Sequence, residues 1–143
     1  MTDETAATIP ATALVAVEAQ LFVTDVAVAC EFYVAKLGFT VAFTYGEPPF
    51  YGQVKRDGVS LNLRQIDEPV FAGDVRERAQ LLSATIVLGG SSELHRLFLE
   101  YQSAGVVFHQ PLRQEPWGAR TFIIQDPDGN LLLFAGPATV RRD

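Results

Sequence analysis

Residues 56–65, Arg-Asp-Gly-Val-Ser-Leu-Asn-Leu-Arg-Gln, hold a turn followed by a strand whose two faces differ in chemistry. Asp57-Gly58 is a strong signal for a hairpin turn. Apolar and polar side chains then alternate, as in a strand with one buried face. The alternation assigns three residues to each face: Val59, Leu61 and Leu63 to a core, and Ser60, Asn62 and Arg64 to an open side. We therefore expect a strand at 59–65 in a sheet that helices cover on one side only.

The second half of the chain repeats the turn and helix-end signals of the first half. Asp128-Gly129 again opens a final strand, and Gly38 and Gly105 each close a helical pattern as C-cap glycines do. The first half predicts strands at 13–23, 39–45, 50–56 and 59–65, and a helix at 26–36 behind the cap candidates Thr24 and Asp25. The second half predicts strands at 83–88, 106–109, 117–125 and 130–135, a loop at 111–116, and a helix at 91–104 with Ser91 and Ser92 as cap candidates.

These elements indicate an α+β fold class, with two β-α-β-β-β modules in one domain. The modules span 13–65 and 83–136, and the linker 66–82 has room for a short helical turn. Residues 1–12 and 137–143 are predicted to be flexible tails. Two such modules can form an open, barrel-like curved mixed sheet with a concave groove.

Alternation in the other strands predicts which side chains line that groove. The core side takes Leu21, Val23, Ala84, Ile86, Leu88, Phe122, Ile124, Leu132 and Phe134. The groove side takes Glu18, Gln20, Phe22, Ser83, Thr85, Val87, Thr121, Ile123, Leu131, Leu133 and Ala135. On the first helix, Phe32, Tyr33 and Cys30 are expected to pack in the core.

Composition and charge exclude several classes of protein. The 143 residues are 48% hydrophobic, which is too many for an intrinsically disordered chain. A formal charge of −6 argues against a nucleic-acid-binding surface. The apolar run 11–17 is too short to span a membrane. The single cysteine, Cys30, and the acidic start Asp3-Glu4 favour a cytoplasmic protein without disulfides or a secretory signal.

Two groups of motifs resemble the vicinal oxygen chelate superfamily of glyoxalases, extradiol dioxygenases and bleomycin-resistance proteins. The first group is Val23-Thr24-Asp25-Val26, Phe32-Tyr33 and Leu37-Gly38-Phe39. The second is Pro-Trp-Gly-Ala-Arg-Thr-Phe at 116–122 followed by Asp-Pro-Asp-Gly-Asn at 126–130, and it is most similar to the bleomycin-resistance branch. The resemblance covers about residues 14–136. It implies a homodimer whose interface grooves, lined by aromatic rings, hold a small molecule.

Metal enzymes of this superfamily carry their ligands on the groove-facing strands. By the resemblance, those positions are held here by Glu18 or Gln20, by Asn62 or Ser60, by Ser83, and by Leu133 where the family has a glutamate. Neither of the two histidines, His95 and His109, falls on such a position. We therefore predict no metal, no cofactor and no catalytic residue, with Glu18 as the single candidate for a metal ligand or a base.

Other acidic residues have structural interpretations. Glu18 has the alternative of an ion pair with Arg64 or Arg120. Asp126 and Asp128 belong to the turn Asp-Pro-Asp-Gly-Asn, where such side chains bond their own backbone.

The predicted ligand site combines aromatic rings with a few polar contacts: Gln20, Phe22, Phe43, Phe50, Tyr51, Asn62, Arg64, Trp117 and Leu133. Flat rings stack on planar ligands, although the same rings can instead seal a dimer interface. Arg64 opposes a strongly cationic ligand, so the ligand need not be cationic.

The resemblance and these residues predict a metal-independent small-molecule binding protein of the bleomycin-resistance type. It would sequester a partly aromatic ligand in a dimer groove, as in antibiotic resistance, and bind neither nucleic acid nor membrane. The alternative is a metal-dependent lyase or dioxygenase that uses Glu18. A third possibility is an interaction module whose aromatic residues bury a protein partner.

Overall fold

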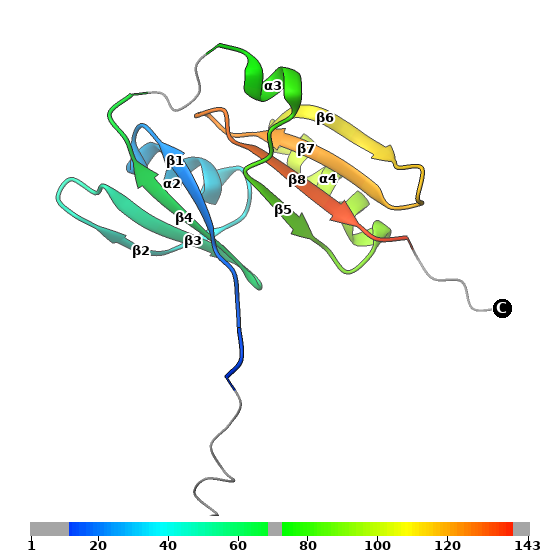
Figure 1. The fold of residues 1–143 in the computed structure, drawn as a ribbon, viewed down its shortest axis with the longest axis horizontal. Coiled ribbons are helices and arrows are strands. Elements are labelled where there is room, and N and C mark those ends of the chain that lie inside the picture. Colours follow the sequence, from blue (N-terminus) through cyan, green and yellow to red (C-terminus); the bar gives the residue numbers. More distant parts are fainter. Residues whose placement is uncertain (1–11, 69–72, 139–143) are drawn as a thin grey trace, which may run out of the picture.

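The computed structural model describes residues 12–68 and 73–138. They form two separate four-stranded sheets with two long helices and one short helix (Figure 1). The α+β fold class predicted from the sequence is therefore confirmed. The tails predicted at 1–12 and 137–143 lie mostly outside the described residues, as does part of the linker 66–82. None of the described helices is long and apolar enough to cross a membrane.

The two halves have the same topology. The first holds β1 (Ala19–Val23), α2 (Val26–Ala35), β2 (Thr40–Tyr45), β3 (Tyr51–Arg56) and β4 (Val59–Gln65), in the sheet order β1-β4-β3-β2. The second holds β5 (Ala84–Val87), α4 (Ser91–Ser103), β6 (Val107–Gln114), β7 (Arg120–Gln125) and β8 (Leu131–Gly136), in the order β5-β8-β7-β6. The short helix α3 (Val75–Ala79) lies between them. In each sheet the first strand pairs parallel to the last, and the other pairs are antiparallel.

The helix ends follow local sequence signals, with one exception. The Asp25 carboxylate accepts a hydrogen bond from the Val28 N–H at 3.0 Å and caps α2 as predicted. Gly38 and Gly105 adopt φ values of +78° and +77°, a left-handed conformation that favours glycine after a helix. The prediction for α4 was wrong, because its N-cap is Gly90 and the predicted caps at 91 and 92 lie inside its first turn.

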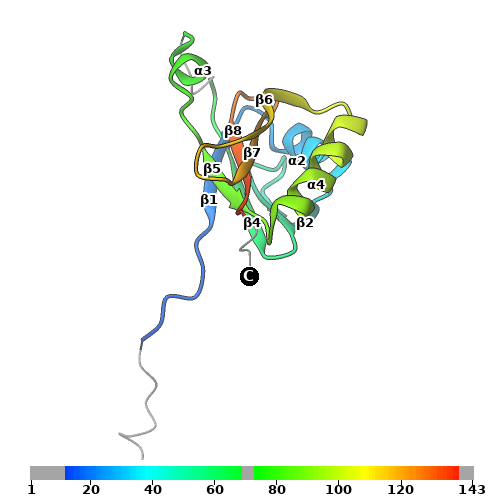
Figure 2. The same ribbon diagram turned by 90° about the vertical axis from the view of Figure 1, so that its right-hand side faces the viewer.

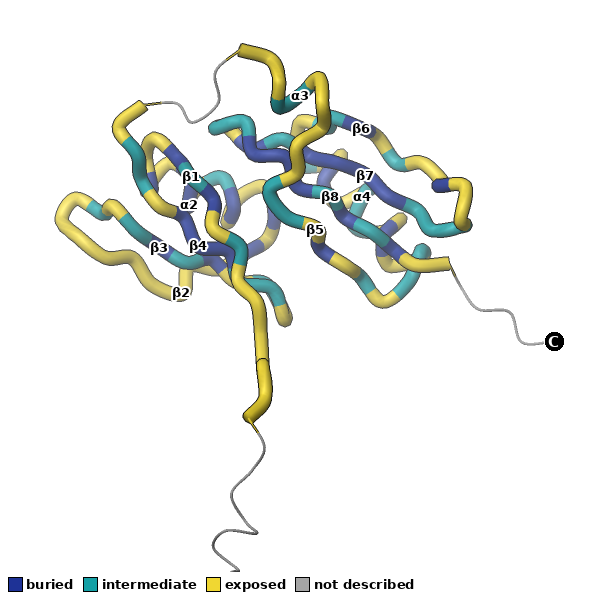
Figure 3. The backbone as a smooth tube through the Cα atoms, viewed as in Figure 1, coloured by how far each residue is buried: buried dark blue, intermediate teal, exposed yellow. Residues whose placement is uncertain are grey.

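The first strand is shorter than predicted. Strand β1 starts at Ala19, which pairs with Leu61. This pairing offset brings residue 17 opposite Val59, the first residue of β4, so the chain before residue 17 has no strand of its own sheet to pair with. Residues 12–18 instead leave the body of the protein as an exposed extended segment, which we call the arm (Figures 1 and 3).

Strand β6 is longer than predicted and reaches Gln114, although it contains Pro111. Proline is tolerated there because β6 is the edge strand of its sheet, and two register shifts interrupt its pairing with β7. The loop predicted at 111–116 is therefore mostly strand. In turn, β7 begins only at Arg120, so Trp117 lies in the β6–β7 turn and not in a strand.

Both halves contribute to one core, with α2 and α4 on the same side of the strands (Figure 2). The predicted core residues of the strands are buried or packed against this core. Three of its buried rings come from the second half: the ring of Phe122 stacks on that of Phe134 at 5.0 Å, and Tyr101 meets both edge-on. Tyr33 and Cys30 are buried in this core and Phe32 packs against it, as predicted.

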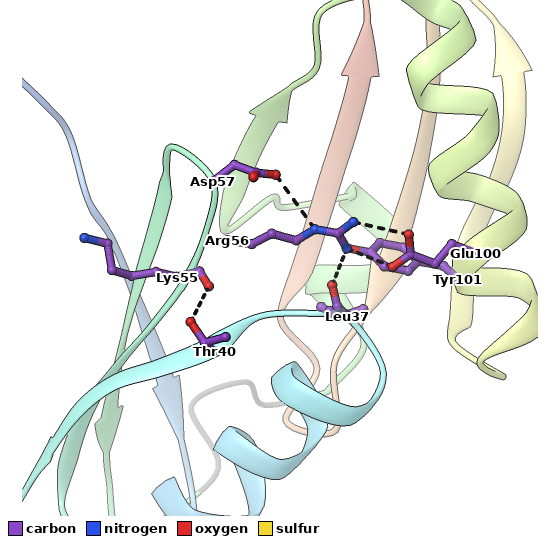
Figure 4. A network of polar contacts seen from close by, with 7 residues as sticks. All are labelled: Leu37, Thr40, Lys55, Arg56, Asp57, Glu100 and Tyr101. Atoms are coloured by element: carbon purple, nitrogen blue, oxygen red, sulfur yellow. Dashed lines mark hydrogen bonds and ion pairs between the residues drawn. The ribbon is translucent and has the colours of Figure 1, made fainter.

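A polar cluster ties the first half to α4 (Figure 4). The Arg56 guanidinium donates to the Leu37 carbonyl at 2.8 Å and to the Glu100 carboxylate at 2.9 Å. The buried Tyr101 hydroxyl donates to the same Leu37 carbonyl at 2.9 Å. The end of α2, the β3–β4 hairpin and α4 are thereby fixed together.

A second polar cluster joins the halves through the turn before β8. Asp126 accepts from the backbone N–H groups of Asp128 and Asn130, which confirms the prediction of a turn. Its other oxygen accepts from the Tyr33 hydroxyl at 2.8 Å. Asp128 accepts from the backbone N–H and the hydroxyl of Thr24, both at 2.9 Å. Burial raises the pKa of Asp126 above its ordinary value, although the donors from Asn130 and Tyr33 oppose the shift.

Candidate functional site

The open face of the first sheet carries two neighbouring rows of side chains that cross all four strands. Residues directly opposite each other on adjacent strands share a face. The pairing gives a first row of Tyr45, Tyr51, Arg64 and Phe22. It gives a second row of Phe43, Gln53, Asn62 and Gln20. Six predicted site residues, Gln20, Phe22, Phe43, Tyr51, Asn62 and Arg64, thus lie together, and we call these two rows the aromatic face.

Rings dominate the side of this face formed by β2 and β3. Phe43 and Tyr51 stack with their centroids 6.1 Å apart and their planes 30° apart. Phe43 is 44% exposed and Tyr45 is 67% exposed, on a strand that is exposed along its whole length (Figure 3). Exposed rings on an edge strand provide flat apolar surface for a planar molecule or for a partner chain.

Amide and carboxylate groups connect the middle of the aromatic face. Gln53 donates to the Asn62 side-chain oxygen at 2.9 Å, and the Asn62 amide donates to the Glu18 carboxylate at 2.9 Å. Gln20 donates to the Tyr51 hydroxyl at 3.3 Å. The expected ion pair of Glu18 with Arg64 or Arg120 was therefore wrong: within the described residues its carboxylate bonds to Asn62 and pairs with neither arginine.

The other three predicted site residues lie elsewhere. Phe50 sits in the β2–β3 turn, where its ring meets that of Tyr45 edge-on at 5.5 Å. Trp117 is 71% exposed in the β6–β7 turn. Figure 1 shows these two turns at opposite ends of the molecule. Leu133 is half-buried on the open face of the second sheet, beside Ile123 and Thr85. One chain does not bring these residues to the aromatic face.

The open face of the second sheet is largely closed within the chain. Thr121, Ile123 and Leu131, which were predicted to line the groove, are at most 4% exposed. The Thr121 hydroxyl donates to Glu115 at 2.6 Å and accepts from Gln110 at 3.1 Å. Hydrogen bonds from Arg113 and Thr121 lower the pKa of Glu115. Thr85 and Val87 on β5 stay exposed, whereas the exposed rings of the predicted groove lie on the aromatic face of the first sheet.

Tyr45 and Gln53 belong to the aromatic face but were missed in the sequence analysis. A signal for Gln53 was present, because the Asp57-Gly58 turn fixes the pairing of the strands around it. Counting back from that turn places Gln53 opposite Asn62 and Tyr51 opposite Arg64, as observed. Tyr45 could be placed only by knowing the β2–β3 pairing, which contains a register shift between Val41 and Phe43.

The positions at which the superfamily holds a metal do not form a metal site here. Across the described ranges, no three His, Cys, Asp or Glu side chains come together in a way that could hold an ion. Leu133 offers no donor atom, and the Ser83 hydroxyl donates to Asn130 at 3.0 Å. Glu18 alone supplies an anionic oxygen, and three or four convergent ligands are needed. These residues do not fit a bound metal.

A cavity of about 450 Å³ lies away from the aromatic face, between the β3–β4 turn, β5 and the start of α4. Its lining combines aliphatic and aromatic side chains, and its polar members include Arg56, Asp57 and Glu93. Arg56 is already held by Glu100 and by the Leu37 carbonyl. We therefore place the candidate site on the aromatic face, whose rings and polar groups lie on one accessible surface.

The sequence of the chain also matches a known protein family. The sequence profile described as the Glyoxalase/Bleomycin resistance protein/Dioxygenase superfamily matches residues 14–134. The chain belongs to this superfamily. No curated protein shows significant sequence similarity to the chain.

Solved structures of the superfamily share the fold. The bleomycin-binding protein of Streptomyces verticillus, solved with copper(II)-bleomycin, is 23% identical, with 91% of this chain and 100% of that chain covered and a TM-score of 0.66. The bleomycin resistance determinant encoded on the transposon Tn5 is 17% identical, with 88% and 100% covered and a TM-score of 0.67. TioX from Micromonospora sp. ML1 is 22% identical, with 83% and 95% covered and a TM-score of 0.64. At these identities the similarity establishes the fold alone.

Proposed function

We propose that this superfamily member binds a partly aromatic small molecule on the aromatic face, without a metal and without changing it chemically, and so sequesters it. The observation that carries the proposal is the pair of rows in which Phe43, Tyr45 and Tyr51 expose their rings beside a set of polar side chains. Such a combination of apolar surface with a few polar groups is typical of small-molecule sites. A relative in fold binds copper(II)-bleomycin, which supports a binding role of the antibiotic-resistance kind.

We propose that the protein acts as a homodimer, and the arm supports this. Leu14, Val15 and Val17 are 100%, 92% and 94% exposed on a segment that leaves the body of the chain. Each such side chain gains roughly 1.5–3 kcal/mol when it is buried. A second copy that covers the arm would supply that burial. A cytoplasmic location, which the single buried thiol favours, is part of the same proposal.

A dimer would also complete the groove. Phe50 and Trp117 lie in turns at opposite ends of one chain (Figure 1), so a groove that uses both requires two chains. In the proposed assembly, Trp117 of the partner subunit closes over the aromatic face. The alternative of an enzyme that uses Glu18 has less support, because its exposed carboxylate is bound by Asn62 and, within the described residues, no second acidic or basic side chain bonds to it.

Isothermal titration calorimetry with 2-naphthamide, a neutral planar probe, tests the binding function on the full chain after treatment with EDTA. We expect saturable binding and recovery of the probe unchanged by mass spectrometry. Phe43→Ala should weaken binding roughly two- to tenfold, the range of a lost aromatic contact. Leu99→Ala, which also shortens an exposed apolar side chain but on α4, should leave it unchanged. Absence of binding, or equal losses in the two variants, would refute the proposal.

A further inference from the structure

We propose that the ligand is a planar aromatic molecule carrying a carboxylate, and that Arg64 binds this anion. The inference rests on the proposed function, because it specifies the ligand of the same aromatic face. Some charged and polar groups on that face are already hydrogen-bonded within the chain. The remaining groups are available to bind a ligand, and they determine its chemistry.

Arg64 lies in the middle of a row of rings. Its pairing partners are Tyr51 on β3 and Phe22 on β1, and Tyr45 is the next residue beyond Tyr51. Its side chain is exposed, and in the described part of the chain it takes part in no ion pair or hydrogen bond. A guanidinium offers a planar fork of N–H donors that matches a carboxylate. An aromatic carboxylate can therefore stack on the neighbouring rings while its anion meets Arg64.

A second donor lies in the same row. The Tyr51 hydroxyl accepts a hydrogen bond from Gln20 at 3.3 Å, which leaves its own proton available to donate. Tyr51 and Arg64 are directly opposite each other on adjacent strands. The row thus presents two donors to a ligand and no carboxylate of its own, which is the arrangement that an anionic acceptor requires.

Neither of the other charged side chains on this face, Glu18 and Lys55, pairs with Arg64. Lys55 follows Tyr51 by four residues along β3, so its backbone is displaced from Arg64 by about 13 Å along the strands. That distance exceeds the screening length of about 8 Å at physiological ionic strength. The Glu18 carboxylate lies nearer, since it accepts from Asn62, two residues from Arg64 on β4, but this hydrogen bond engages it and it forms no ion pair with Arg64. The charge of −6 on the whole chain is therefore compatible with a locally positive site at Arg64.

Three probes that share one ring system test the inference: 2-naphthoate, 2-naphthamide and 2-naphthylmethylammonium, each titrated calorimetrically into the full chain. We expect 2-naphthoate to bind about ten- to a hundredfold more tightly than the amide, which is the range of a hydrogen bond to a charged group, and the ammonium to bind most weakly. Arg64→Gln should abolish the preference for the carboxylate while 2-naphthamide still binds. The matched control Lys55→Gln removes a cation from the same face and should keep the preference.

The outcomes separate this inference from the function on which it rests. If none of the three probes binds the natural chain, the proposed function fails and this inference fails with it. If 2-naphthamide binds as tightly as 2-naphthoate, or the ammonium binds best, only the assignment of an anionic ligand is overturned. A carboxylate preference that survives in Arg64→Gln would overturn the role of Arg64. Equal loss of the preference in Lys55→Gln would show that general charge attraction, and not Arg64, is responsible.

Discussion

Replacing Tyr33 by phenylalanine should destabilise the protein through one hydrogen bond that joins its halves. The Tyr33 ring is fully buried and meets Phe32 and Phe39 edge-on, contacts that phenylalanine keeps. Its hydroxyl donates to the buried Asp126 carboxylate at 2.8 Å. A hydrogen bond to a charged group contributes about 1.5–3 kcal/mol. Because Asp126 keeps its donors from Asp128 and Asn130, we expect a loss at the lower end, about 1.5–2 kcal/mol.

The loss should depend on pH. Burial already places the folded pKa of Asp126 above its ordinary value, which destabilises the fold at neutral pH, and this cost disappears as the pH falls through the folded pKa. The Tyr33 hydroxyl opposes that shift, so removing it raises the pKa of Asp126 further. The deficit of Tyr33→Phe is therefore full at neutral pH and shrinks in acid, where the carboxyl is protonated in both proteins.

Tyr101→Phe is the matched control. It removes a buried hydroxyl of the same kind, but one that donates to the neutral Leu37 carbonyl, which also keeps its bond from Arg56. We expect a loss of about 0.5–1.5 kcal/mol without this acid dependence. Urea unfolding of both variants at neutral and acid pH measures the two deficits. Equal deficits that do not change with pH would refute the assignment of the Tyr33 bond to a buried carboxylate.

Three further substitutions or probes test the core, the second sheet and the thiol. Phe134→Ala should cost about 3–5 kcal/mol in urea unfolding, because its buried ring stacks on Phe122, and a loss no larger than that of an exposed-ring variant would contradict a shared aromatic core. Glu115→Gln should lower the melting temperature near neutral pH, since Arg113 depresses the pKa of this carboxyl and the stabilisation is lost as the pH falls through the depressed value. If the variant still melts below the natural protein in strong acid, the result would count against the pairing of Glu115 with Arg113. Cys30, which is 8% exposed and whose pKa burial raises, should react slowly with a thiol reagent until urea is added; rapid labelling of the native chain would show an accessible thiol.

Period-two patterns and turn chemistry were enough to predict most of the fold. Asp57-Gly58 and Asp128-Gly129 each mark a turn before a strand, and the alternation behind them found the core-facing residues Leu61, Leu63, Leu132 and Phe134. It did not show that Asn62 and Leu131, assigned to the open side, are buried as well. The errors arose where position in the sheet overrode local pattern. Residues 13–16 have a strand-like sequence but no strand of their own sheet to pair with. Pro111 looks like a loop residue and is tolerated in β6 because that strand is at an edge.

The candidate site was predicted less completely than the fold. The alternation found the faces of Asn62 and Arg64, yet the row that joins Tyr45 to them depends on a β-bulge in β2 that no local signal indicates. Glu18 was expected beside an arginine, and only the three-dimensional packing shows that Asn62 lies closer. The prediction of Trp117 as a ligand contact depended on the family resemblance. Because Trp117 lies at the end of the molecule opposite the β2–β3 turn, it can contribute to the site only in the proposed dimer.

Chemical-shift mapping can show whether the aromatic face binds a planar molecule without a metal. Backbone amide spectra of the full chain would be recorded in EDTA while 2-naphthoate is added. We expect the largest shifts in β2, β3 and β4, at Phe43, Tyr51 and Arg64, with further shifts in the turn around Trp117. Shifts confined to the cavity beside Gly58 and Leu97, or shifts that appear only after a divalent metal is added, would contradict metal-free binding at the aromatic face.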